Sequence, residues 1–156
     1  MRDRGKQFED RFEKDWIKTF PGNIILRIPD QMSHYKGSSR NICDFIEFDG
    51  KLLYFTECKS GKGASFPFSE IPQYERMLPF VGKHNVRVGV VLWLYEKDLV
   101  YYIPISTITQ MKNDGKKSVG IKAVEEGYNI KVIPSKKLKI FMDSDYSILS
   151  ELKEGE

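Results

Sequence analysis

The chain of 156 residues suits one domain, and its 40% hydrophobic and 30% charged residues are ordinary for a globular protein. A net charge of +3 permits a nucleic-acid partner without requiring one. No apolar run approaches the ~20 residues of a membrane helix, and the charged start MRDRGKQFED lacks a signal-peptide core. We therefore expect a cytoplasmic protein with no membrane partner.

The first periodic segment predicts an amphipathic helix from about Lys6 to Phe20, with apolar residues at helical spacing. Glu9 and Glu13 stand one turn apart on it, and for a lone helix solvent exposure is the favoured interpretation of both. Arg4, just upstream, is a candidate DNA contact. A short strand over residues 24–28 is expected next.

The segment from Pro29 to Asn41 has no periodicity and contains proline, glycine, serine and positive charges, which is typical of an exposed loop. Loops of this length are often functional. Its aromatic and basic residues suit base stacking and phosphate contact, as in Tyr35, Lys36 and Arg40. A plain surface loop is the alternative interpretation.

The stretch from Asn41 to Lys59 indicates two strands joined by a tight turn. Asp49-Gly50 favours a two-residue type I′ hairpin, because both central residues of that turn need positive φ. Phe48 would then pair with Lys51. This register fixes which side chains share a face of the strand pair.

In that register Asp44 and Glu57 are diagonal neighbours on one face, and Lys59 follows on the same side. The other positions of both faces are mainly apolar, as in a strand pair covered on both sides. Two carboxylates are hard ligands suited to Mg²⁺, and a nearby ammonium can orient water or offset charge on a phosphate. The pattern is typical of metal-assisted phosphodiester hydrolysis, and a surface hairpin with scattered charges is the alternative.

The segment after this pair begins with Gly61-Lys62-Gly63, which lacks the full spacing of a phosphate-binding loop. Lys62 is kept as a candidate DNA contact. Ser69 is placed to cap a helix over residues 70–78, in whose first turn Pro72 is tolerable. Gln73 would lie near the start of that helix, close to the end of the Lys59 strand.

The second half of the chain predicts a buried strand over residues 86–95 and an antiparallel partner over 99–103. A short helix over 106–111 and a lysine-rich segment of small strands or turns follow. The lysine-rich segment packs beside the core or contacts a phosphate backbone. A capped helix over 143–152 ends an α/β domain whose mixed sheet is flanked by helices.

The cysteines and histidines give no pattern of a disulfide or a zinc site. Cys43 and Cys58 would face different cross-strand partners, so reduced core thiols are expected. His34 and His84 are far apart in sequence, and no CxxC occurs.

The order of these pieces resembles the PD-(D/E)XK nuclease superfamily, and within it the RecU-type Holliday junction resolvases. The likeness lies in RGKQFED, CDFIEFDGKLLYFTECKS, FPFSEIPQYERM and VGVVLWLY followed by LVYYIP. It implies a restriction-endonuclease-like α/β fold over 1–156 as a single nuclease domain, with a protruding loop at 29–41.

The resemblance also implies roles for individual residues. Asp44 and Glu57 would be metal ligands and Lys59 the catalytic lysine, while Glu9 matches the acidic residue of the first helix. Gln73 matches a glutamine that follows a histidine in typical members, whereas Pro72 precedes it here.

The function implied is a homodimeric endodeoxyribonuclease that uses Mg²⁺, with Mn²⁺ as the alternative, to make paired nicks in four-way DNA junctions. Two sites related by a two-fold axis are the simplest way to cut two strands symmetrically. Two alternatives stay open: a nuclease of this superfamily acting on flaps, ends or a duplex target, and a junction-binding module without turnover.

Overall fold

A computed structural model gives the structure of residues 3–29 and 41–156. Its helices and strands, in chain order, are α1 (Arg4–Thr19), β1 (Ile24–Arg27), β2 (Phe45–Phe48), β3 (Leu53–Gly61), β4 (Ser65–Pro67), η1 (Phe68–Glu70), α2 (Tyr74–Met77), η2 (Leu78–Phe80), β5 (Val86–Leu94), β6 (Leu99–Pro104), α3 (Ile105–Asn113), β7 (Ser118–Gly120), α4 (Ile121–Glu125), β8 (Lys131–Val132), β9 (Ser135–Lys137), β10 (Met142–Ser144) and η3 (Ser147–Glu151). None of the helices in these two ranges is both long and apolar enough to cross a bilayer.

Among the described residues, six strands form the central sheet in the order β1-β2-β3-β5-β6-β8. Only β3 and β5 are parallel, and the other neighbours in the sheet are antiparallel. Two small antiparallel pairs, β4 with β7 and β9 with β10, lie outside this sheet. The expected mixed sheet is therefore confirmed.

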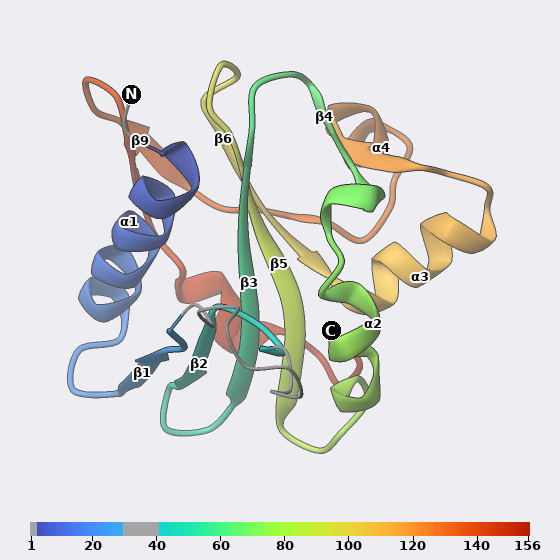
Figure 1. Cartoon of the computed structure of the whole chain (residues 1–156). Helices are drawn as coiled ribbons and strands as arrows, with labels where there is room; N and C mark the ends of the chain where they lie inside the picture. Colours follow the sequence, from blue (N-terminus) through green and yellow to red (C-terminus); the bar gives the residue numbers. More distant parts are fainter. Residues whose placement is uncertain (1–2, 30–40) are drawn as a thin grey trace, which may run out of the picture.

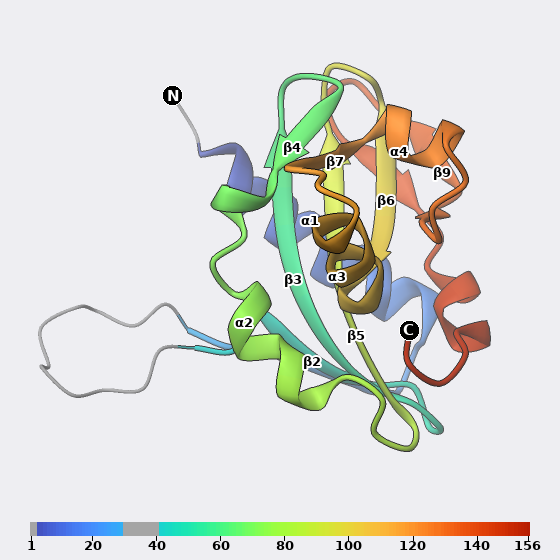
Figure 2. The same cartoon turned by 90° about the vertical axis from the view of Figure 1, so that its right-hand side faces the viewer.

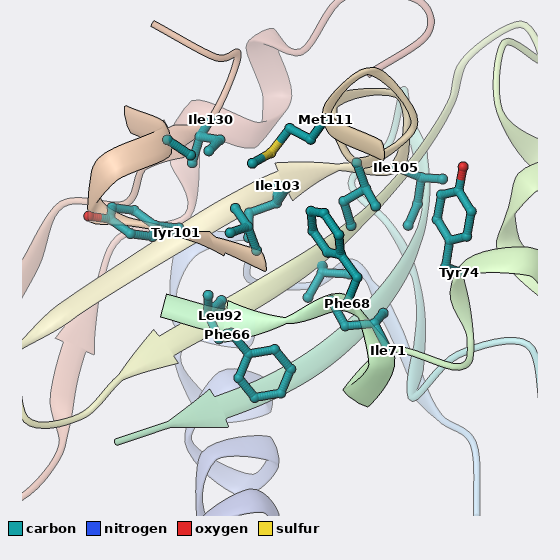
Figure 3. Close-up of a cluster of buried hydrophobic side chains, with 14 of the residues drawn as sticks. Phe66, Phe68, Ile71, Tyr74, Leu92, Tyr101, Ile103, Ile105, Met111 and Ile130 are labelled. Atoms are coloured by element: carbon teal, nitrogen blue, oxygen red, sulfur yellow. The ribbon is translucent and has the colours of Figure 1, made fainter. Parts of the chain in front are cut away.

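The sheet is covered on both faces, with α1 on one side and α2, α3 and α4 on the other (Figure 1). On the α1 side, Phe8, Phe12 and Trp16 are buried against Tyr54 and Trp93 of the central strands. The other face carries a cluster built from β4, β5, β6 and the helices (Figure 3). Because β5 is buried on both sides, it has the continuous apolar sequence that the sequence analysis assigned to a central strand.

Two predicted helices differ from the structure. The helix expected over 70–78 is broken into η1, α2 and η2, and Ser69 makes no capping hydrogen bond. Proline disfavours helical geometry in the residue before it, and Ile71, which precedes Pro72, is buried and not helical. The helix expected over 143–152 is shorter, because residues 142–144 pair with β9 as a strand before η3 begins.

The turn between β2 and β3 is longer than predicted. Phe48 pairs with Leu53, not with Lys51, so residues 49–52 form the connection. Gly50 has positive φ (97°), while the Asp49 carboxylate accepts hydrogen bonds from the backbone N–H groups of Lys51 and Leu52. The register therefore differs by two residues from the predicted one, a shift that leaves each side chain on its predicted face.

A buried carboxyl group lies on the α1 side of this strand pair. The Glu47 side chain is fully buried, and its Oε2 accepts a hydrogen bond of 3.1 Å from the hydroxyl of Thr56. Its Oε1 has no hydrogen-bond partner in the part of the chain that the structure describes. Burial raises the pKa of Glu47 to about 8, against the opposing effect of the Thr56 hydrogen bond.

This pKa predicts a pH-dependent stability. Between about pH 4.5 and 8 the folded chain holds a proton on Glu47 that the unfolded chain has released, so stability falls as pH rises. The loss is up to ~1.4 kcal/mol per pH unit. Glu47→Gln removes this titration, so its free energy of unfolding should rise relative to wild type between pH 5 and pH 8 in urea denaturation.

The control for this experiment is Glu154→Gln, which changes an exposed glutamate and should follow the wild-type pH profile. A difference between wild type and Glu47→Gln that stays constant from pH 5 to pH 8 would contradict the prediction.

Candidate active site

A pocket lies where β3 ends, between the start of α1 and the segment from β4 to α2, with a cavity volume of about 520 Å³. The residues that line it are Asp3, Arg4, Gly5, Glu9, Asp44, Glu57, Cys58, Lys59, Ser60, Phe66, Glu70, Gln73 and Tyr95. All five side chains predicted to be catalytic are among them. The fold therefore brings together residues from α1, β3 and two connecting segments.

Asp44 and Glu57 form the carboxylate pair of this pocket. Asp44 immediately precedes β2, and extending the observed register places it opposite Glu57. Its Oδ2 accepts a hydrogen bond of 2.9 Å from the backbone N–H of Cys58, which fixes it beside β3. The two carboxylates are thus closer in register than the diagonal arrangement expected from the sequence.

Glu57 is held in an unusual environment for a carboxylate. Its side chain is 4% exposed, and Oε2 is buried with no hydrogen-bond partner among residues 3–29 and 41–156. Its pKa is raised to about 9, chiefly by burial and then by the charge of Asp44, while Lys59 acts in the opposite direction. A cation beside the pair would relieve this cost.

Lys59 lies on the same face of β3 as Glu57, with its Nζ 3.5 Å from Glu57 Oε1. Its side chain is 20% exposed, so the ammonium reaches the pocket from a largely covered stem. A strand holds residues two apart on one face, and this spacing places the lysine directly beside the carboxylate pair.

The first helix contributes Glu9 to the pocket. Glu9 Oε2 accepts a hydrogen bond of 2.7 Å from the Arg27 guanidinium of β1, which also pairs with Asp10. Glu13, one turn further along, lies 3.7 Å from Arg27 and does not line the pocket. The side chain of Glu9 is therefore largely covered and ion-paired, not solvated, and its catalytic role stays a prediction.

Gln73 enters from the segment just before α2. Its Oε1 is buried and has no hydrogen-bond partner within the described residues. The side chain lines the pocket even though the helix expected around it is broken at Pro72.

The pocket also contains residues that the sequence analysis missed. Tyr95 follows β5, and the Arg4 guanidinium lies 5.6 Å from the centre of its ring. Asp3 and Glu70 add two carboxylates. The signal for Tyr95 was present in the sequence, since the carboxyl ends of neighbouring parallel strands meet at one edge of a sheet.

Some predicted DNA contacts lie elsewhere. Lys62 is outside the pocket, 74% exposed, with its Nζ 3.9 Å from Glu96. Tyr35, Lys36 and Arg40 lie outside the described residues, and their roles stay predictions. The two ends of that segment are joined at its base, where the Asn41 amide donates a hydrogen bond of 2.6 Å to the carbonyl oxygen of Pro29.

The donor set of the pocket fits a hard divalent cation. Mg²⁺ is commonly bound by one or two carboxylates together with water and substrate phosphate. Asp44 and Glu57 supply two adjacent carboxylates to the lining of the pocket. Within the described ranges, no group of three or more histidine, cysteine, aspartate or glutamate side chains forms a metal cluster.

Comparison with family models and with curated proteins returns no match to this sequence. Among solved structures, the chain is similar to Hjc of Archaeoglobus fulgidus, a Holliday junction resolvase from an archaeal hyperthermophile. The TM-score is 0.57 at 18% sequence identity, over 80% of this chain and 94% of that chain. The likeness confirms the predicted fold class, an α/β architecture with a mixed sheet flanked by helices.

Proposed function

We propose that this chain is a Mg²⁺-dependent endodeoxyribonuclease that cuts four-way DNA junctions. The observation that carries the proposal is the meeting of Glu9, Asp44, Glu57, Lys59 and Gln73 in one pocket. These residues come from distant parts of the sequence, and a pure binding module would gain nothing from carboxylates that face a polyanion. The fold shared with a Holliday junction resolvase supports the choice of substrate.

Asp44 and Glu57 would hold the metal ion. A bound Mg²⁺ supplies Lewis-acid polarisation of a phosphate oxygen and lowers the pKa of a bound water. Mn²⁺ also prefers carboxylate and water oxygen ligands, and it is the alternative ion.

The chain's own side chains supply positioning and charge. Lys59 can donate to a non-bridging phosphate oxygen or orient a water at the pocket floor, since its Nζ lies beside Glu57. Gln73 offers a partnerless carbonyl oxygen to a water in the pocket, and Glu9 offers a carboxylate fixed by Arg27. Arg4, at the pocket mouth, can bind an adjacent phosphate.

Paired nicking implies a homodimer of RecU type, in which two such pockets face a substrate with two-fold symmetry. Residues 30–40 lie between Pro29 and Asn41, which are joined by a hydrogen bond, and Asn41 precedes Asp44 by three residues. Its Tyr35, Lys36 and Arg40 are the proposed contacts that distinguish a junction from linear duplex.

The central test measures cleavage of a labelled four-way junction and of a matched duplex, with Mg²⁺ or with EDTA. The wild-type protein should nick the junction only with Mg²⁺, and Asp44→Asn should abolish cleavage. The asparagine oxygen can still accept the hydrogen bond from Cys58, so the variant should fold and bind DNA at least as tightly. Undiminished cleavage by Asp44→Asn would contradict the assignment of Asp44 as a metal ligand of the active site.

Lys59→Ala should lower the single-turnover rate by about 10²-fold, as expected for the loss of one group acting in the transition state. The matched variant is Lys62→Ala, which removes an ammonium outside the pocket and should change DNA affinity but not the rate at saturating protein. Equal rates for both variants would make Lys59 a structural residue only.

Glu9→Gln should impair cleavage more than Glu13→Gln, because only Glu9 lines the pocket although both lie near Arg27. Thermal unfolding of both variants separates this effect from loss of the ion pairs. Equal, small effects on the cleavage rate would contradict a role for Glu9.

A further inference from the structure

A second hollow lies beside the catalytic pocket, across β4. It has a cavity volume of about 370 Å³, and we call it the lysine pocket. The residues of its lining that matter here are Ser65, Lys116, Lys117, Ser118, Gly120 and Lys122. Phe66 of β4 lines the catalytic pocket, whereas its neighbour Ser65 lines the lysine pocket. One short strand therefore separates the two sites.

The lysine pocket is positively charged. Lys116 pairs with Glu126 at 3.0 Å, so its charge is balanced. In the two ranges that the structure describes, Lys117 and Lys122 form no ion pair, and both are exposed. Two uncompensated ammonium groups thus face solvent at this hollow.

The position of these lysines is fixed relative to β4. Figure 2 shows β4, β7 and α4 close together near the end of β3. A Cβ at Gly120 would overlap the carbonyl oxygen of Ala64, so only glycine lets β7 approach β4 this closely. The backbone N–H of Phe68 also donates to the carbonyl of Lys117 at 2.9 Å. The two pockets are therefore held in one rigid arrangement.

The catalytic pocket by itself is poorly suited to attract DNA. Its lining contains more acidic than basic side chains, since Asp3, Glu9, Asp44, Glu57 and Glu70 stand against Arg4 and Lys59. DNA binding gains free energy mainly because lysine and arginine side chains neutralise phosphates and release the counterions that had surrounded them. A basic surface next to the catalytic pocket would add to that free energy.

We propose that the lysine pocket binds the phosphate backbone of the DNA whose scissile phosphate lies in the catalytic pocket. The proposal rests on the nuclease function proposed above. A DNA arm is longer than either hollow, so an arm placed in one pocket continues past β4 to the other. Lys117 and Lys122 contact phosphates as point charges, and the Ser65 and Ser118 hydroxyls can donate further hydrogen bonds.

The test compares the double variant Lys117→Ala/Lys122→Ala with a matched double variant, Lys51→Ala/Lys83→Ala. Lys51 and Lys83 are also exposed, but they precede β3 and β5 and so lie at the opposite end of these strands. Affinity for a labelled duplex and a labelled four-way junction is measured by fluorescence anisotropy in EDTA at several salt concentrations. EDTA keeps the measurement independent of cleavage.

The Lys117→Ala/Lys122→Ala variant should bind both DNAs about tenfold or more weakly at 0.15 M salt. The slope of log K against log salt concentration should fall by about 1.8, the value for two lost phosphate contacts. The Lys51→Ala/Lys83→Ala variant should keep the wild-type slope. Lys117→Arg/Lys122→Arg should restore the affinity, which loss of fold in the alanine variant would not explain.

An unchanged slope in Lys117→Ala/Lys122→Ala, with Asp44-dependent cleavage intact, would overturn this inference and leave the nuclease function standing. A reduced slope in a protein that cleaves no DNA would overturn the nuclease function and support the lysine pocket as a DNA contact. Absence of DNA binding by the wild-type protein would overturn both.

Discussion

The parallel pairing of β3 with β5 is the contact on which the rest of the molecule depends. It runs from Leu53–Val86 to Gly61–Leu94, and β5 is buried along almost its whole length. Because both strands end at the same edge, Lys59 and Tyr95 are delivered to one pocket, and the carbonyl of Gly61 accepts a hydrogen bond from the Tyr95 N–H. The chain continues from this edge into β4, which lies between the candidate active-site pocket and the lysine pocket. Loss of this pairing would disperse both sites.

The candidate active-site pocket contains buried polar atoms that have no hydrogen-bond partner among the described residues, and so does the surrounding core. Most buried polar atoms in folded proteins have a hydrogen-bond partner. Glu57 Oε2 and Gln73 Oε1 lack one among the described residues, and both residues line the same pocket. Adjacent carboxylates in a buried position destabilise the folded state, and proteins tend to retain such features where function requires them. Glu47, on the other face, is hydrogen-bonded to Thr56 through Oε2, while its Oε1 also lacks a partner among the described residues.

Much of the site was predictable from the sequence because strand faces depend only on odd and even spacing. Asp44, Glu57 and Lys59 share a face in the predicted and in the observed register. Local sequence patterns gave a wrong or incomplete prediction where contacts between distant residues determine the structure. Leu52 is buried in the α1-side core, which lengthens the predicted two-residue turn. The Glu9–Arg27 ion pair joins a helix to a strand, and sequence spacing carries no information about it.

The hydrogen bond between Asn41 and Pro29 has a consequence for how the molecule can change over evolutionary time. It closes the chain segment 30–40 at its base, so the length of that segment is uncoupled from the position of Asp44. The entropy of closing a chain segment grows only with the logarithm of its length, and doubling the length costs about 0.6 kcal/mol. Insertions and deletions there are thermodynamically cheap. A lineage could therefore change the length of this segment while the carboxylate pair and its lysine stay in place.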